Sequence, residues 1–136
     1  MSRFVIFKVL FLAFLLSILF AGCTESALAP QFEPEVSNKT DSFEFQASGL
    51  TGITETLKYN WSNTGVKANI NQSTTTSGGT ATLVLRDVSN LEVYNRNLSE
   101  NGTFFSQEGQ TGTWEIVIVL NDFHGTINFR VEKNTN

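Results

Sequence analysis

The residue types that carry out chemistry are few in this chain, and their spacing does not group them. The sequence holds one histidine, His124, and one cysteine, Cys23. A serine or cysteine hydrolase needs a nucleophile, a base that accepts its proton and a group that orients the base. His124 is the only candidate base, it lies in a run that predicts a hairpin turn, Asn121–Gly125, and the chain has no G-x-S-x-G motif. We therefore predict a solvated turn histidine and a protein that is not an enzyme, with a small hydrolase built on His124 as the alternative.

Metal sites and sugar-cleaving sites are not indicated either. Zn²⁺ needs three or four His, Cys or carboxylate ligands, and the chain has a single His and a single Cys. Ca²⁺ needs several oxygen ligands at one loop; Asp87 or Asp122 could supply part of such a set, although acidic residues at turns more often form the turn itself. A glycoside hydrolase needs two acids across a cleft. No spacing selects such a pair among Glu92, Glu100, Glu108 and Glu115. We expect no metal, no cofactor and no catalytic pair.

Aromatic residues are the remaining candidates for binding. Tyr59, Trp61 and Trp114 alternate in phase with aliphatic residues, so we assign them to the core. Tyr94 and Phe123 are out of phase or lie in a predicted turn, and an exposed aromatic ring can stack on a sugar or contact a partner protein. We predict that Tyr94 and Phe123 are exposed binding residues.

The first 22 residues have the three parts of a secretory signal peptide. A basic portion with Arg3 and Lys8 precedes an apolar run from Val9 to Phe20, and small residues follow. The apolar run is shorter than the ~20 residues that a membrane-spanning helix needs. We therefore predict a signal peptide over residues 1–22.

The run Leu19-Phe20-Ala21-Gly22-Cys23 resembles the lipobox of bacterial lipoproteins. The resemblance implies that the sulfur of Cys23 carries a diacylglycerol, and that cleavage makes Cys23 the new N-terminus, whose amine can also be acylated, for example by palmitate. One acyl chain binds a membrane only marginally, whereas two or three make attachment effectively permanent. Thr24 in place of Asp after the cysteine implies delivery to the outer membrane if the envelope is Gram-negative. We expect a lipid anchor at Cys23 and a location in the bacterial cell envelope.

The processed chain is acidic. Nine basic residues stand against thirteen acidic ones, and removal of Arg3 and Lys8 leaves seven basic residues and a net charge of −6. No basic run is present, whereas phosphate binding depends on clustered Lys and Arg. Nucleic acid is therefore not an expected partner.

The rest of the chain divides into a spacer and one domain. Residues 23–41 predict a lipidated cysteine and a flexible spacer, because Thr24–Asp41 holds Pro30 and Pro34 among small polar residues and has no apolar periodicity. From residue 42 to residue 136, apolar and polar residues alternate with the period-2 pattern of half-buried strands. We expect eight strands, whose inward residues are Phe43, Phe45 and Ala47; Leu57, Tyr59 and Trp61; Val66, Ala68 and Ile70; Ala81, Leu83 and Leu85; Leu91 and Val93; Phe104; Trp114, Ile116, Ile118 and Leu120; and Ile127, Phe129 and Val131.

Turn residues separate these runs, and no window after Cys23 has the apolar spacing of a helix. Ser77–Gly79 and Asn121–Gly125 are two of the expected turns. Short strands at regular spacing predict an all-β fold. We expect a two-layer antiparallel β-sandwich of jelly-roll or Ig-like type, because two facing layers bury single-faced strands without requiring the sheet to close on itself.

Three stretches resemble the closing strands of bacterial pre-peptidase C-terminal domains and similar jelly-roll modules. They are Ala81–Asp87, Gly112–Ile118 and Gly125–Val131. The resemblance supports the fold alone, because sandwich folds carry many unrelated activities.

These patterns together favour a lipid-tethered module of the bacterial envelope that binds a ligand or has a structural role, and that catalyses no reaction. The alternative is an adhesin-like domain that recognises carbohydrate or peptide with Tyr94 and Phe123. In both cases the expected partner besides the membrane is an envelope protein or a glycan.

Overall fold

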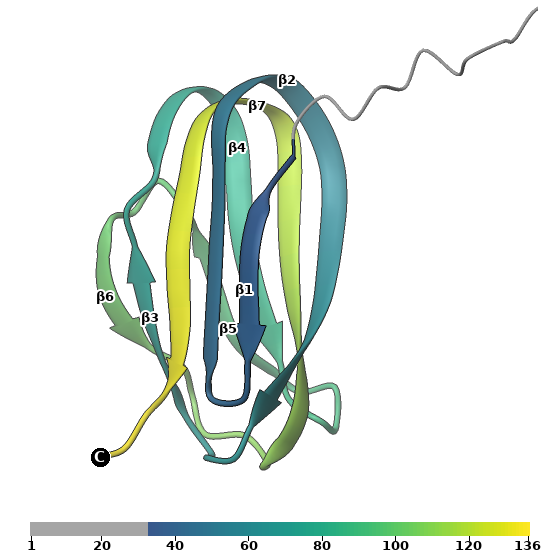
Figure 1. Cartoon of the computed structure of the whole chain (residues 1–136), viewed down its shortest axis with the longest axis vertical. Helices are drawn as coiled ribbons and strands as arrows, with labels where there is room; N and C mark the ends of the chain where they lie inside the picture. Colours follow the sequence, from purple (N-terminus) through teal and green to yellow (C-terminus); the bar gives the residue numbers. More distant parts are fainter. Residues whose placement is uncertain (1–32) are drawn as a thin grey trace, which may run out of the picture.

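The computed structural model describes residues 33–136, and all regular elements in that range are β-strands. They are β1 (Glu35–Lys39), β2 (Ser42–Asn63), β3 (Ala68–Gln72), β4 (Thr75–Arg86), β5 (Glu92–Asn97), β6 (Gly102–Phe105) and β7 (Gly112–Lys133) (Figure 1). The prediction of an all-β antiparallel sandwich is confirmed. The predicted signal peptide, the lipobox and Cys23 lie outside the described residues.

Strands β2 and β7 run through both layers. They pair antiparallel along almost their whole length, from Ser42 opposite Glu132 to Asn63 opposite Gly112, and both fold over at their middles. Figure 1 shows this fold-over at the top of the view. The first half of β2 and the second half of β7 join β1, β3 and β6 in a five-strand layer. The second half of β2 and the first half of β7 join β4 and β5 in a four-strand layer.

Glycines make the fold-over of β2 possible. Gly49 and Gly52 have φ angles of +66° and +61°, a region that is costly for other L residues. Between Ala47 and Glu55, the register of β2 against β7 shifts three times, as in β-bulges that bend a strand. β2 therefore crosses from one layer to the other as one continuous strand.

Two predicted turns are instead bends inside strands. Asn121–Gly125 lies within β7, and Ser77–Gly79 lies within β4. The residues on both sides of Asn121–Gly125 pair with β2 and not with each other, so no hairpin forms there. Turn-forming residue types indicate a change in chain direction, but they do not reveal which strand the flanking residues pair with.

Residues 33–136 form seven strands, whereas the sequence predicted eight. The first two predicted runs are the halves of β2, and the last two are the halves of β7. One strand, β1, lies in the predicted spacer: Glu35–Lys39 pairs with Ser42–Gln46, so the domain begins before residue 42. All residues of β1 are exposed, so this edge strand has no apolar alternation that a sequence pattern could reveal.

The core lies between the two layers and follows the predicted alternation. In the five-strand layer, the rings of Phe43 and Phe45 stack on Phe129, with centroids 6.0 and 5.5 Å apart. In the four-strand layer, Trp61 and Trp114 pack edge to face at 5.9 Å. All five side chains are buried, and burying a side chain of this kind stabilises the fold by about 1.5–3 kcal/mol or more. The assignment of both tryptophans to the core is confirmed.

Two predicted core positions are wrong. Val66 and Leu91 are 49% and 52% exposed. Each lies in a connection just before a strand begins, β3 at Ala68 and β5 at Glu92. The alternation of those strands therefore does not extend to them.

Candidate functional site

The structure places both predicted binding aromatics in the core. Phe123 is fully buried, because it lies on the inward side of the β7 fold-over, opposite Ile53. Tyr94 is 7% exposed and lies opposite Leu85 on the inward side of β5. The prediction that these rings are exposed is wrong, and neither can stack on a ligand at the surface.

Tyr94 instead joins the two layers. Its hydroxyl donates a hydrogen bond to Oε1 of Gln72, in β3, at 2.7 Å. Nε2 of Gln72 in turn donates to the carbonyl oxygens of Asn97 and Glu100, at 3.1 and 2.7 Å. Burial raises the pKa of Tyr94 to about 12, against a smaller lowering by the charge of Arg96. Both the oxygen and the nitrogen of the buried Gln72 amide thus have hydrogen-bond partners, as buried polar groups generally do.

His124 lies in the fold-over of β7 and not in a hairpin turn. Its Nε2 atom is 3.4 Å from Oδ1 of Asp122. Its ring lies beside Gly52 of β2 and Gly78 of β4, so the imidazole occupies space that two glycines leave free. Within residues 33–136, no serine or threonine hydroxyl hydrogen-bonds to His124. Among the described residues, His124 therefore has no hydroxyl nucleophile hydrogen-bonded to it.

Asp87 forms the connection between β4 and β5. Its Oδ1 atom accepts hydrogen bonds from the backbone N–H and hydroxyl of Ser89, at 2.9 and 2.7 Å, and from the N–H of Leu91 at 2.9 Å. Its Oδ2 atom accepts from the N–H of Gln110 at 2.8 Å. These bonds, led by the Ser89 hydroxyl, lower the pKa of Asp87. The Asp87 carboxylate therefore stabilises the turn, which is the role that the sequence favours over calcium binding.

Asp41 has a similar structural role between β1 and β2. Its carboxylate accepts from the N–H and the hydroxyl of Thr64, each at 2.7 Å, and pairs with Nζ of Lys133 at 3.0 Å. The Thr64 N–H is the main reason that the pKa of Asp41 is lowered. Asp41 thus ties the first hairpin to the β2–β3 turn and to the end of β7.

The other acidic candidates are dispersed. The four glutamates named above contact four different cations, in the pairs Glu92–Arg86, Glu100–Arg96, Glu108–Lys67 and Glu115–Lys58. Among the residues that the structure describes, no group of three or more His, Cys, Asp or Glu could hold a metal ion. The structure brings none of the predicted catalytic candidates together except Asp122 and His124.

The outward side of the five-strand layer forms a surface that we call the polar face. Because side chains alternate along a strand, the residues between the buried phenylalanines point away from the core. The polar face consists of Glu35, Ser37, Glu44, Gln46, Asn69, Asn71, Ser73, Thr103, Phe105, Asn128, Arg130 and Glu132. One row of it, Thr103, Asn71, Arg130, Glu44 and Ser37, crosses all five strands in register.

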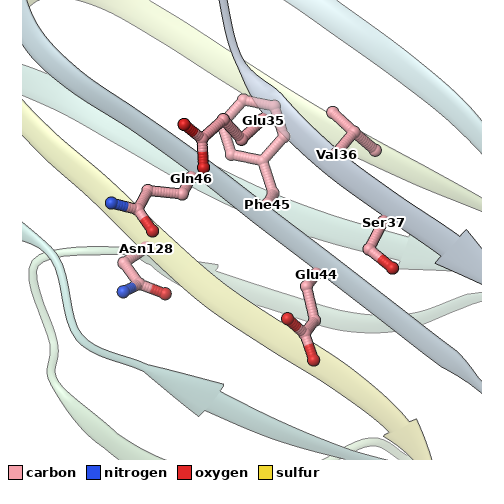
Figure 2. Close-up of a pocket in the computed structure, with 7 residues that line it drawn as sticks. All are labelled: Glu35, Val36, Ser37, Glu44, Phe45, Gln46 and Asn128. Atoms are coloured by element: carbon pink, nitrogen blue, oxygen red, sulfur yellow. The ribbon is translucent and has the colours of Figure 1, made fainter.

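Two hollows lie on the polar face and meet at Asn128. The first, of about 220 Å³, is lined by Glu35, Val36, Ser37, Glu44, Phe45, Gln46 and Asn128. The second, of about 350 Å³, is lined by Asn71, Ser73, Asn128, Arg130 and Glu132. Figure 2 shows the side chains of Gln46 and Asn128 next to each other in the first hollow. Together, the hollows extend from β1 across β2 and β7 to β3.

The one cation of the polar face, Arg130, is already ion-paired. The guanidinium of Arg130 is 2.8 Å from a carboxylate oxygen of Glu44 and 3.8 Å from one of Glu132. Beside it, Nδ2 of Asn71 donates to the hydroxyl of Thr103 at 3.1 Å. The centre of the face therefore consists of an ion-paired arginine surrounded by amides and hydroxyls.

Phe105 supplies the one large exposed aromatic ring of the polar face. It is 62% exposed and lies opposite Asn69, which in turn lies opposite Glu132 at the second hollow. Phe105 was not predicted as a binding residue, although strand alternation indicates it, because the inward position predicted for Phe104 places Phe105 outward. Phe104 itself packs against the core.

Comparisons with models of protein families, with curated proteins and with solved structures find no match to this chain. Within residues 33–136, no helix is long and apolar enough to cross a membrane.

Proposed function

We propose that the chain is a lipid-anchored module of the bacterial envelope that binds a ligand through the polar face and catalyses no reaction. The lipobox resemblance at Cys23 supports the anchor. The observation that carries the binding role is the pair of hollows that meet at Asn128 on an exposed face. The structural contacts of Asp87, Asp41 and Tyr94 also favour binding over turnover, because the side chains suited to chemistry already hold the fold together.

The point where the chain enters the domain suits a role close to the membrane. Glu35 begins β1 and also lines the first hollow. Eleven residues separate Cys23 from Glu35, and a chain of this length spans at most about 40 Å. The first hollow is therefore within reach of an envelope protein or glycan near the membrane surface.

Labelling with radioactive palmitate tests the anchor. We expect label in the wild-type chain and none in Cys23→Ser, because the thioether and the processed amine both depend on this cysteine. Ser26→Ala is the matched control, since it changes a neighbouring residue and leaves the thiol. Label that persists in Cys23→Ser contradicts the proposed anchor.

A pair of arginine substitutions tests the binding face. Asn128→Arg places a long cation where the two hollows meet, whereas Asn95→Arg makes the same change on the exposed side of β5, in the other layer. We expect the immobilised full chain to retain a component of the detergent-solubilised envelope, and we expect only Asn128→Arg to lose it. Equal behaviour of the two variants contradicts a role for the polar face.

A further inference from the structure

We propose, building on the proposed function, that the polar face binds a neutral oligosaccharide. The ring of Phe105 would stack on one sugar, and the amides of Gln46, Asn71 and Asn128 would bind hydroxyl groups of the following sugars. This assigns a ligand class and a stacking residue to the two hollows.

The charges of the site favour a neutral ligand over an anionic one. The residues that line the hollows include three carboxylates, Glu35, Glu44 and Glu132, and one guanidinium, Arg130. Arg130 already contacts two of these carboxylates, at 2.8 and 3.8 Å. A phosphate or carboxylate ligand would meet net negative charge and would compete for an arginine that is already paired.

The polar groups of the site match hydroxyls. A side-chain amide offers both a donor and an acceptor, and so does a sugar hydroxyl. Asn128 and Gln46 lie opposite each other in the register of β7 and β2, and Asn71 lies one strand further, opposite Arg130. All three amides are exposed on the same side of the layer. A ligand with many hydroxyls can therefore bind several of them at once.

Phe105 provides the apolar part of such a site. A sugar ring has a face of C–H groups that packs on an aromatic ring, and Phe105 is the most exposed large apolar residue among those described. It lies at the β6 edge of the polar face, one strand from Asn71 and two strands from Glu132, which both line the second hollow. Five strands spaced by ~4.8 Å give the face a width of about 19 Å, which suits several linked rings better than a single sugar.

Calorimetric titration of the full chain tests this proposal, in a detergent without a sugar headgroup. The probes are three neutral hexamers (of glucose in α-linkage, of glucose in β-linkage and of N-acetylglucosamine), together with an oligogalacturonate as the anionic probe and an alanine-rich pentapeptide. We expect one neutral hexamer to bind, and Phe105→Ala to raise its Kd at least about tenfold. Phe105→Tyr keeps an aromatic ring and is expected to restore binding.

Leu91→Ala is the matched control, because it also removes an exposed apolar side chain, 52% exposed, but lies between β4 and β5. Its Kd is expected to equal that of the wild type. The proposal is overturned if no neutral hexamer binds, if Phe105→Ala and Leu91→Ala behave alike, or if only the oligogalacturonate or the peptide binds. In these cases the Asn128→Arg retention assay still reports separately on whether the polar face binds any envelope component.

Discussion

The outward sides of the two layers differ in the side chains that strand alternation places on them. On the four-strand layer, Val84 and Val117 point outward and yet are only 8% exposed, and the ion pair between Lys58 and Glu115 lies in the same region of the layer. On the five-strand layer, the corresponding positions hold amides, hydroxyls and the Arg130 ion pairs, and the surface is hollowed. Around Val84 and Val117, the first surface is therefore covered by its own side chains, whereas the second is hollowed.

This difference does not arise from the core, because both layers share it. The same two strands, β2 and β7, run through both layers, and their inward residues form one buried cluster. The amides of the polar face bury little apolar area, so the hydrophobic effect does not require them. We infer that residues on the polar face are free to serve binding, while Val84 and Val117, on the outward side of the four-strand layer, contribute to packing.

The largest expected effect tests whether the layers share one core. Phe129 stacks on Phe43 and Phe45 in the five-strand layer, and Phe129→Ala should lower the free energy of unfolding by about 3–5 kcal/mol. The two tryptophans, Trp61 and Trp114, lie in the four-strand layer and report on it by fluorescence. We expect the tryptophan signal and the far-UV circular dichroism to shift to the same lower urea midpoint. A tryptophan midpoint that stays at the wild-type value would mean that the layers unfold separately.

The second prediction exchanges residue types between the two outward surfaces. Val84→Asn places an amide at a nearly covered position, where an unpaired amide costs about 1–3 kcal/mol. Asn71→Val makes the opposite change on the polar face and should alter the free energy of unfolding by no more than about 0.5 kcal/mol. Urea unfolding of both variants measures the contrast. Similar losses from the two substitutions would show that the surfaces do not differ as described.

Much of the core could be predicted from the sequence, because period-2 alternation depends only on which side of a strand faces water. The inward positions of Trp114, Ile116 and Ile118 follow directly from it. The continuity of β2 and β7 could not be predicted, since Gly49 and Asp122 signal a bend without revealing the partner of the flanking residues. An exposed edge strand such as Glu35–Lys39 carries no apolar signal at all.

Less of the candidate site than of the core could be predicted from the sequence. Tyr94 was assigned outward because Val93 was assigned inward, yet the structure buries both. The loop after β6 covers Val93, where the N–H of Gln107 bonds to the carbonyl oxygen of Val93 at 2.8 Å. Burial on both sides of an edge strand depends on a distant loop, so alternation within β5 could not reveal it. The hollows depend in the same way on residues of β1, β2, β3 and β7 that only the fold brings together.

The third prediction concerns the hydrogen bond that joins the layers, from Tyr94 in β5 to Gln72 in β3. The pKa of Tyr94 is raised by burial from 10.0 to about 12, so the folded state favours the neutral phenol. The stability that this provides is fully present below pH 10 and is lost as the pH rises from 10 to about 12. Tyr94→Phe should cost about 1 kcal/mol at neutral pH and remove this alkaline dependence. Urea unfolding between neutral and alkaline pH, together with ultraviolet absorbance of the phenolate, measures both effects. A loss of stability above pH 10 that is unchanged in Tyr94→Phe would assign the dependence to other groups.

The smallest expected effect compares an ion pair on each outward surface. Arg130→Gln on the polar face and Lys58→Gln on the four-strand layer each break a pair between half-exposed side chains, and such pairs contribute about 0–1 kcal/mol. Urea unfolding should therefore not distinguish the two variants. Titration of the oligosaccharide should distinguish them, because Arg130→Gln removes the cation that pairs with Glu44 at the first hollow and Glu132 at the second. Unequal stability with equal affinity would reverse the roles assigned to the two surfaces, because the polar face would then hold the fold together and would not shape the ligand site.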